Sequence, residues 1–330
     1  MIAATALAVM LSACAPTVIP AGSAVRAPSL TSDRYVAADG TALPVVEWPA
    51  ANGPPKAVIL GLHGFGDYRK AWDEPAEIWA KAGITTYSYD QRGFGKSPTR
   101  GRWPGTEALV DDAKAMAVLL RAQYPGVPLY LAGESMGGAV ALVAADQGIE
   151  VDGLILVSAA LRSRDTFGPV LNAGVWFVAH TIPWFPNGPT SIDFQPTDNP
   201  KTLDKLRNDP MMLRVARMDM GYGLLDLMDA ARASAERVHM PYLMLHGLGD
   251  RIVPQEPVRA AIAVMPPRGD SKLAFYKEGY HMLLRDKEGK IVADDVVAWM
   301  SDHEAGLPSG ADASRSQPEI AALWGSKRSR

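Results

Sequence analysis

The sequence predicts an α/β fold in which a mostly parallel sheet is flanked by helices. Six short apolar runs alternate with segments of helical periodicity, as a sheet with crossover helices requires, and they lie at residues 57–62, 85–89, 129–132, 154–157, 242–245 and 273–276. Runs this short and this apolar are typical of strands buried on both faces. The 330 residues fit one such domain with insertions, and we expect it to occupy residues 33–304.

The first elements along the chain are predicted by a turn signal and by two helical stripes. Residues 34–48 alternate around Asp39-Gly40, which favours a hairpin that adds antiparallel strands to the sheet edge. Residues 74–82 predict a helix that stops at Gly83. A second helix begins near Thr106, carries an apolar face and ends before Pro125.

Charge and glycine patterns exclude several classes of partner. The 33 basic and 36 acidic side chains give a formal net charge of −3, so no strong positive field is expected to attract nucleic acid. Neither a phosphate-binding loop nor a dinucleotide-binding glycine pattern is present, and residues 93–97 are interpreted as a turn. We therefore expect no nucleic-acid partner.

A pentapeptide of the form Gly-x-Ser-x-Gly follows the apolar run at 129–132. Residues 133–137 read Gly-Glu-Ser-Met-Gly and open a segment of small residues, so the order is strand, sharp turn, helix. In this setting the serine sits on a strained turn that presents its hydroxyl above the sheet edge, and the glycines allow neighbouring backbone to come close. Ser135 is the candidate nucleophile.

A serine nucleophile needs a base and an acid, which this fold supplies later in the chain in the order Asp or Glu, then His. Asp250 follows the run at 242–245 and is the candidate acid, with Asp270 and Asp286 as competitors. His281 follows the run at 273–276 and is the candidate base, because the other five histidines precede the acid or lie near the end. The histidine takes the serine proton, and the carboxylate orients the imidazole and stabilises its charge.

The tetrahedral intermediate of such a reaction needs two preorganised hydrogen-bond donors. In this architecture they are the backbone amide after the nucleophile and one amide from the loop after the third strand. The candidates are Met136, which follows Ser135, and Phe65, which lies between two glycines in the loop after residues 57–62.

Together these segments resemble the monoacylglycerol lipase and lysophospholipase-like group of the α/β-hydrolases. The resemblance is carried by residues 63–66, 89–97, 133–138, 246–253 and 279–281, and the chain has Asp67 where such lipases often have Glu. It implies a central sheet with an inserted helical cap, cleavage of carboxylic esters of glycerol or glycerophospholipids, and no metal or organic cofactor. It also implies catalytic roles for Ser135, Asp250 and His281, with Phe65 and Met136 as oxyanion donors.

The interval between the runs at 154–157 and 242–245 exceeds the length of one crossover helix, so we expect a cap at about residues 161–237. Its aromatic residues are interrupted by prolines and polar residues, which argues against a membrane span. Trp176, Phe177 and Trp184 are candidates for binding the acyl chain of a substrate, with contact to lipid or simple packing of the cap as the alternatives.

The single cysteine, Cys14, ends the tetrad Leu-Ser-Ala-Cys behind an apolar start, which resembles a bacterial lipobox. We expect residues 1–13 to be a signal peptide, Cys14 to carry the lipid, and residues 14–32 to be a tether. This places the protein in a bacterial cell envelope, held at the membrane, with a cytoplasmic protein as the alternative. Residues 305–330 lack a sustained apolar period and are predicted to be a mobile tail.

The function predicted from these features is serine-dependent hydrolysis of lipid-like carboxylic esters through an acyl-enzyme. Amide or peptide cleavage is the nearest alternative, because the same three residues serve both reactions. A non-catalytic anchored binding protein is the alternative from another class, since a fold alone does not establish turnover.

Overall fold

The fold is described by a computed structural model that covers residues 15–187 and 195–325, so Cys14 and the predicted signal peptide lie outside the described residues. Its main element is a sheet of nine strands in the order β1-β2-β3-β5-β4-β6-β7-β10-β11. The strands are β1 (Ser29–Leu30), β2 (Arg34–Val36), β3 (Ala42–Trp48), β4 (Ala57–Leu62), β5 (Ile84–Tyr89), β6 (Leu129–Glu134), β7 (Gly153–Val157), β10 (Tyr242–Gly247) and β11 (Lys272–Tyr276). From β5 to β11 neighbouring strands are parallel, whereas β1, β2 and β3 pair antiparallel at one edge.

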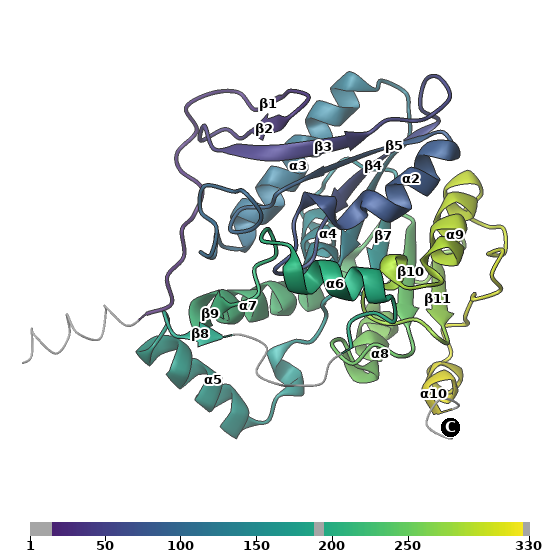
Figure 1. The fold of residues 1–330 in the computed structure, drawn as a ribbon. Coiled ribbons are helices and arrows are strands. Elements are labelled where there is room, and N and C mark those ends of the chain that lie inside the picture. The colour runs from purple at the N-terminus through teal and green to yellow at the C-terminus, as the bar shows by residue number, and fades with distance from the viewer. Residues whose placement is uncertain (1–14, 188–194, 326–330) are drawn as a thin grey trace, which may run out of the picture.

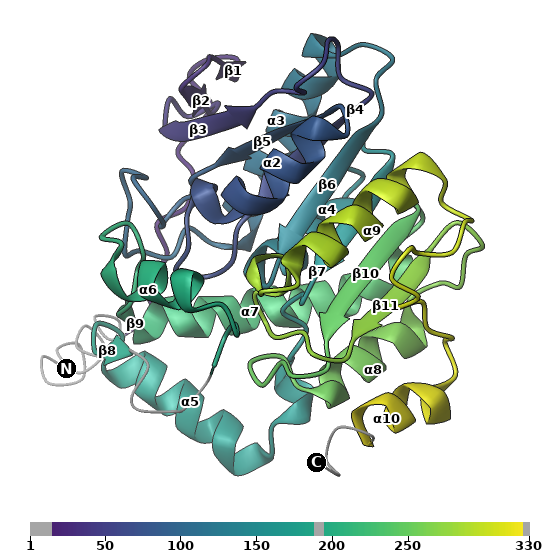
Figure 2. The same ribbon diagram turned by 45° about the vertical axis from the view of Figure 1, so that its right-hand side comes forward.

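Helices cover both faces of this sheet (Figures 1 and 2). One face is covered by α2 (Asp73–Lys81) and α9 (Gly289–Ser301). The other is covered by α3 (Thr106–Gln123), α4 (Met136–Asp146), α7 (Met218–Ser234) and α8 (Gln255–Val264). Short 3₁₀ turns join these elements at Arg69–Trp72, Arg164–Thr166, Ala235–Arg237 and Leu283–Arg285.

The two cores follow from the alternation of side chains along each strand. In β4, Ile59 faces the core beneath α2 and α9, whereas Val58 and Leu60 face the core beneath α3 and α4. In β10, Leu243 and Met244 divide in the same way. A strand buried on both sides must be apolar at every position, and this explains why the strands appear in the sequence as continuous apolar runs.

The early elements confirm the expectations from the sequence. β2 and β3 pair antiparallel with Val36 opposite Ala42, and Gly40 in the turn between them has φ of 83°. The helix predicted at 74–82 is α2, and the helix predicted from Thr106 is α3, which ends at Gln123, two residues before Pro125.

The segment before β1 lies against the domain instead of hanging free. The amide of Ile19 donates to the carbonyl of Trp103 at 2.8 Å, and that of Gly22 donates to the Asp39 carboxylate at 2.9 Å. The amide of Val25 donates to the carbonyl of Ala38 at 2.8 Å. Much of the stretch expected to act as a tether is therefore attached to the folded domain.

The end of the chain is also packed, and the prediction of a mobile tail from residue 305 is wrong for the described residues. The amide of Ala313 donates to the carbonyl of Leu273 at 2.8 Å, which extends the pairing at the β11 edge. Helix α10 (Gln317–Gly325) follows and packs against α8 through the buried side chains of Ile320 and Trp324. Two buried side chains four residues apart form no sustained apolar period, which is why the sequence did not predict this short helix.

The predicted cap divides into two parts. Helix α5 (Pro169–Thr181), β8 (Pro186–Asn187), α6 (Pro200–Asn208) and β9 (Ala216–Arg217) stand off the sheet, with β8 paired to β9 (Figure 2). Helix α7, by contrast, packs on α4 and contributes Leu227 and Ala231 to the main core. Among the described helices, none combines the length and the apolar character needed to cross a bilayer.

Candidate active site

Ser135 occupies a strained turn between β6 and α4. Its φ of 52° and ψ of −114° lie outside the regions that L-residues prefer, so its side chain projects from the turn. The flanking glycines are required by space: a Cβ on Gly133 would lie 2.3 Å from the carbonyl oxygen of Gly137, and one on Gly137 would lie 2.1 Å from that of Leu62. The Ser135 amide donates to the carbonyl of Val157 at 2.9 Å, which fixes the turn against the neighbouring strand β7.

His281 and Asp250 meet in the loops that follow the adjacent strands β11 and β10. The His281 Nδ1 atom lies 2.8 Å from the Asp250 Oδ2 atom. The other carboxylate oxygen, Oδ1, accepts hydrogen bonds from the amides of Ile252 at 2.8 Å and Val253 at 3.0 Å. Both oxygens of this buried carboxylate are therefore engaged, and the orientation of Asp250 is fixed.

The two groups shift each other's titration. Burial opposes the charged forms of both, but the Asp250 carboxylate and its hydrogen bond outweigh burial and raise the pKa of His281 above its usual value. The charge and hydrogen bond of His281 likewise outweigh burial and lower the pKa of Asp250. Each group therefore favours the charged form of the other.

The competing acids lie elsewhere. Asp270 binds Arg268 at 2.7 Å, and the Asp286 carboxylate accepts from the amide of Tyr280 at 2.7 Å instead of from the His281 ring. Burial raises the pKa of Asp286 to about 6.

Four of the other five histidines have local structural contacts, and the fifth, His239, lies at the surface before β10. His63 bonds its own loop, His180 stacks on Trp176, and His303 stacks on Trp299. His246 is buried beside Phe275 and Trp324.

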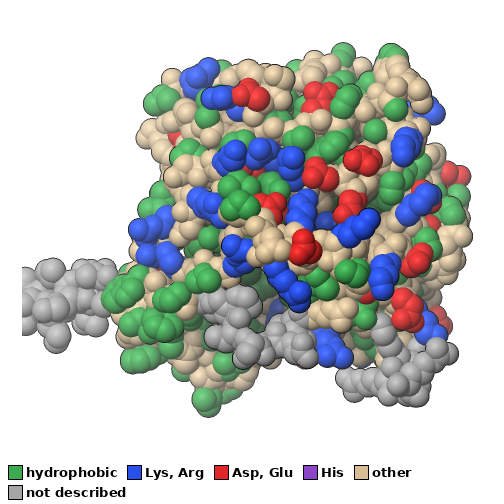
Figure 3. Space-filling view, in the orientation of Figure 1, with side chains coloured by type: hydrophobic (Ala, Val, Ile, Leu, Met, Phe, Trp, Pro, Cys, Tyr) green, Lys and Arg blue, Asp and Glu red, His purple; other side chains and the backbone are tan. Residues whose placement is uncertain are grey.

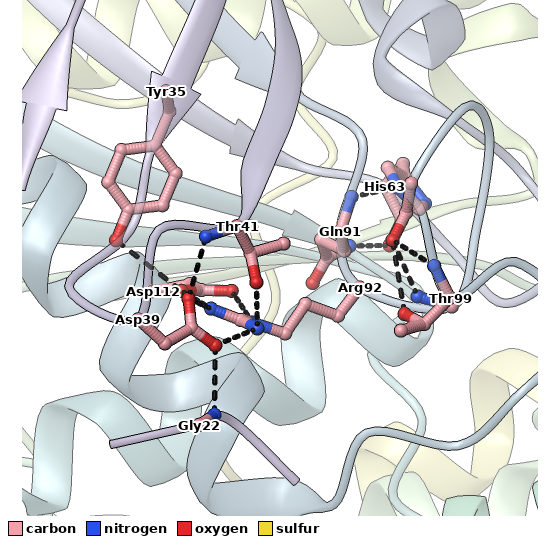
Figure 4. A network of polar contacts seen from close by, with 11 residues as sticks. Gly22, Tyr35, Asp39, Thr41, His63, Gln91, Arg92, Thr99 and Asp112 are labelled. Atoms are coloured by element: carbon pink, nitrogen blue, oxygen red, sulfur yellow. Dashed lines mark hydrogen bonds and ion pairs between the residues drawn. The ribbon is translucent and has the colours of Figure 1, made fainter. Parts of the chain in front are cut away.

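The loop at residues 63–67, called here the oxyanion loop, passes directly over Ser135. A Cβ built on Gly64 would lie 3.4 Å from the Ser135 Cβ, at van der Waals contact, so the loop runs close against the nucleophile at this point. The His63 Nδ1 atom bonds the Gly64 carbonyl at 2.9 Å, and its Nε2 atom accepts from the amide of Gln91 at 3.1 Å (Figure 4). Phe65 packs edge-on against Phe94 with the ring centroids 5.2 Å apart. Met136 is the first residue of α4, where backbone amides are free of helical partners.

A second polar network in Figure 4 centres on Arg92 and ties the amino-terminal hairpin to α3. The guanidinium lies 2.8 Å from Asp39 and 2.7 Å from Asp112, and all three side chains are buried. Asp39 in turn holds the amide of Gly22. Burial raises the pKa of Asp112 to about 6, although Arg92 opposes the shift. This network explains how the segment before β1 is attached.

Arg285 was not anticipated from the sequence. Its guanidinium is buried between Asp67 of the oxyanion loop at 2.7 Å and Glu134, the residue before Ser135, at 2.5 Å. One signal in the sequence was available: Glu134 lies between an apolar strand and the serine, where a buried carboxylate requires a cation.

A cavity of about 1060 Å³ opens beside the Asp250 loop, between α8 and α10. Its walls include Leu248, Arg251, Arg259 and Trp324. Packing of α10 therefore shapes the space next to the candidate acid.

The three candidate substrate-binding aromatics lie on the outside of the cap. The exposed fractions are 53% for Trp176, 61% for Phe177 and 53% for Trp184. They belong to a group of exposed apolar side chains, called here the α5 patch: Val170, Leu171, Trp176, Phe177, Trp184, Phe185 and Val215. In Figure 3 hydrophobic side chains gather at the lower left, where Figure 1 places α5, β8 and β9. The aromatics face solvent in this structure.

Within residues 15–187 and 195–325, no group of three or more histidine, cysteine or acidic side chains is placed to hold a metal ion.

Comparisons with known proteins show which family and which proteins the chain resembles. A family model described as serine aminopeptidase, S33, matches residues 53–288. A monoacylglycerol lipase of Mycolicibacterium smegmatis is 26% identical over 257 residues, which are 76% of this chain and 89% of that protein. The monoglyceride lipase of Homo sapiens is 28% identical over 280 residues, which are 82% of this chain and 90% of that protein.

Solved structures show the same fold. The monoacylglycerol lipase of Paleococcus ferrophilus superposes with a TM-score of 0.67 at 23% identity, covering 79% of this chain and 99% of that one. A soluble variant of the monoglyceride lipase of Saccharomyces cerevisiae, in complex with a substrate analog, gives a TM-score of 0.69 at 21% identity, covering 88% of this chain and all of that one (100%).

Proposed function

Because the chain belongs to the serine aminopeptidase S33 family of α/β-hydrolases, we propose that it hydrolyses carboxylic esters of lipid-like molecules through an acyl-enzyme formed on Ser135. The observation that carries the proposal is the 2.8 Å contact between His281 and Asp250 in loops at the sheet edge that also presents Ser135. Monoacylglycerols are the substrates favoured, because the relatives named above are monoacylglycerol lipases, and lysophospholipids are the alternative lipid esters.

The proposed mechanism assigns one step to each residue. The Ser135 hydroxyl oxygen attacks the ester carbonyl while the His281 Nε2 atom takes its proton, and Asp250 stabilises the imidazolium through Nδ1. The backbone amides of Met136 and Phe65 bind the developing oxyanion. The imidazolium then protonates the leaving alcohol, and the acyl-enzyme forms. Water attacks this ester by the same route and releases the carboxylic acid and free Ser135.

Amide or peptide cleavage remains a second candidate, because the matching family model is described as a serine aminopeptidase. The two candidates differ in the leaving group that His281 must protonate. A panel of esters and amides that share one acyl group separates them: higher kcat/KM for glycerol esters supports the proposal, and higher kcat/KM for aminoacyl amides contradicts it.

Labelling with a fluorophosphonate probe tests the nucleophile directly. We expect the wild-type protein to be labelled and Ser135→Ala to be unlabelled, inactive and folded, because the change removes the attacking oxygen and few packing contacts. A Ser135→Ala variant that keeps its activity would contradict the assignment. So would a Ser135→Ala variant that the probe still labels and whose other peptides are unchanged.

We also propose that Cys14 carries a lipid that holds the enzyme at a membrane of a bacterial cell envelope. The first described residues lie beside β8 and β9, on the side of the molecule that carries the α5 patch (Figures 1 and 2), so an anchor and this apolar surface would face the same bilayer. Cys14→Ser is expected to leave the membrane fraction while keeping its rate on water-soluble esters. An unchanged distribution and an unchanged mass of the amino-terminal peptide would contradict lipidation.

A further inference from the structure

Three loops meet at the candidate active site, and a single buried side chain joins them. The oxyanion loop carries Asp67, the turn of the nucleophile carries Glu134, and Arg285 follows His281 by four residues. Arg285 donates from Nη1 to Asp67 at 2.7 Å and from Nη2 to Glu134 at 2.5 Å. The exposed fractions of the three side chains are 6%, 4% and 6%, so water does not compete for these bonds.

The backbone of Arg285 is itself held in place. Its carbonyl oxygen accepts hydrogen bonds from Thr202 Oγ1 at 3.0 Å, Asn199 Nδ2 at 3.1 Å and Thr197 Oγ1 at 3.3 Å. These donors lie at and before the start of α6, the cap helix seen across the front of the molecule in Figure 1. A guanidinium on a fixed backbone has little freedom, which suits it to hold other groups in place.

The geometry of a guanidinium is needed for this arrangement. Its two terminal nitrogens point in different directions within one plane, so each bonds one carboxylate while the distance between the carboxylates stays fixed. A lysine ammonium has the same charge but is a single point, and it cannot keep this spacing. Asp67 is four residues from His63 and next to Gly66, while Glu134 is bonded directly to Ser135. Arg285 therefore links the loop that carries Phe65 to the turn that carries Ser135.

We propose that Arg285 is a positioning residue that locks the oxyanion loop, the turn of the nucleophile and the loop of His281 into one reactive geometry. This inference rests on the proposed serine-hydrolase function. Arg285 touches none of the reacting atoms in it; its contribution is to keep the amide of Phe65 at a constant distance from Ser135 during the reaction. An error of about 1 Å in such a distance is enough to lower a rate by about 10²-fold.

The same cluster contributes to the field at His281. The charged and titratable groups that face the imidazole are Asp250 and His246 from the β10 side, Glu134 from β6 and Arg285 from the turn after His281. Of these, Glu134 favours the protonated imidazole and Arg285 opposes it, after the larger effects of burial and Asp250. Substitutions can therefore separate the effect of this cluster on the position of the loops from its electrostatic effect on His281.

The experiment compares Arg285→Lys with Arg92→Lys, using kcat, KM, the acid limb of the pH profile and the rate of fluorophosphonate labelling. Arg92 is a matched control, because it is also buried between two carboxylates, Asp39 and Asp112, but lies in the hairpin network. We expect Arg285→Lys to lower kcat and the labelling rate by about 10²-fold. KM is expected to change by less than about threefold, and the acid limb of the pH profile is expected to stay at the same pH. We expect Arg92→Lys to lower the melting temperature and to retain the wild-type kcat.

Two isosteric variants complete the test. Glu134→Gln keeps an oxygen to accept from Arg285 but removes the anion, so its acid limb is expected to move to lower pH and its weaker bond to Arg285 is expected to lower kcat as well. Asp67→Asn keeps the shape of the side chain and weakens the hold on the oxyanion loop, so it is expected to lower kcat without a comparable change in KM. It tests the proposal even where Arg285→Lys does not fold.

Wild-type kcat in Arg285→Lys or in Asp67→Asn overturns the proposal, as does an equal loss of kcat in Arg92→Lys, which would show that the effect is general destabilisation. An unmoved acid limb in Glu134→Gln overturns the contribution to the field. These results are distinct from failure of the proposed function, in which the wild-type protein itself is neither labelled nor active.

Discussion

Replacing Asp250 by Asn tests the role of the carboxylate, and the structure predicts how the new side chain will lie. The oxygen Oδ1 accepts from the amides of Ile252 and Val253 at 2.8 and 3.0 Å, so the amide oxygen of Asn takes this place. Its NH₂ group then faces the His281 Nδ1 atom, which must accept instead of donate. The imidazole proton moves to Nε2, and Nε2 can no longer take the proton of Ser135.

The size of the fall in kcat distinguishes a wrong tautomer from the loss of an ordinary contact. A wrong tautomer lowers kcat by about 10²- to 10⁴-fold, which corresponds to about 3 to 5 kcal/mol of barrier. A neutral hydrogen bond contributes only about 1 kcal/mol, or roughly a fivefold effect. KM is expected to change little, because Asp250 does not touch the substrate in the proposed mechanism.

The assay measures kcat and KM with a water-soluble ester across the pH range and compares the melting temperature of the variant with that of the wild-type protein. A second signature is expected, since the carboxylate raises the pKa of His281: residual activity in Asp250→Asn should have its acid limb at lower pH. A kcat within about threefold of wild type, in a folded variant, refutes the reasoning and moves the acid role to another carboxylate.

Three further predictions follow from the geometry. The pKa of His281 is raised above its usual value of 6.5, and only the neutral imidazole accepts a proton. A pH profile should therefore show kcat/KM constant at high pH and falling on the acid side, with its midpoint above pH 6.5; a midpoint below pH 6.5 contradicts this. Gly137→Ala places a Cβ 2.1 Å from the Leu62 carbonyl oxygen and should lower the free energy of unfolding by about 1–3 kcal/mol in denaturant titrations, whereas Gly174→Ala, with no atom within 4 Å, should be neutral or stabilising. Trp176→Ser with Phe177→Ser should weaken binding to phospholipid vesicles in a flotation assay and leave kcat on soluble esters unchanged; an equal loss across acyl lengths of soluble esters would assign these aromatics to holding the cap.

The sheet was predictable because its strands leave a local signal. The runs around Ile59, Leu131 and Leu243 are apolar at every position, and burial on both faces demands this wherever the strand lies in the chain. The turn at Asp39-Gly40 and the helix start at Thr106 are likewise predicted by a few adjacent residues. The candidates Ser135, Asp250 and His281 were proposed in the same way, since each lies in the turn or loop after such a strand.

What escaped prediction depends on contacts between distant parts of the chain. Arg285 and Asp67 are separated by 218 positions. Asp67 lies in a loop and Arg285 at the end of a 3₁₀ turn, and charged residues in such places usually face water. Helix α10 depends on the fit of Trp324 against His246 and Phe275, which no local periodicity records. The exposure of Trp176 and Phe177 follows from the way in which α5 stands off the sheet, and an apolar side chain in the sequence does not say whether it faces a pocket, a core or a membrane.

The attachment of the segment before β1 limits the distance between the domain and the membrane that would hold the proposed lipid anchor. Val18 pairs with Trp103, so four peptide steps separate Cys14 from the rigid body, a reach of at most about 14 Å when fully extended. With so short a segment between the anchor and the domain, the enzyme cannot reach across a compartment to a second membrane or rotate freely above the first. Its substrates would have to arrive in the same leaflet that holds the anchor, and its search for them would be confined to diffusion in the plane of that leaflet.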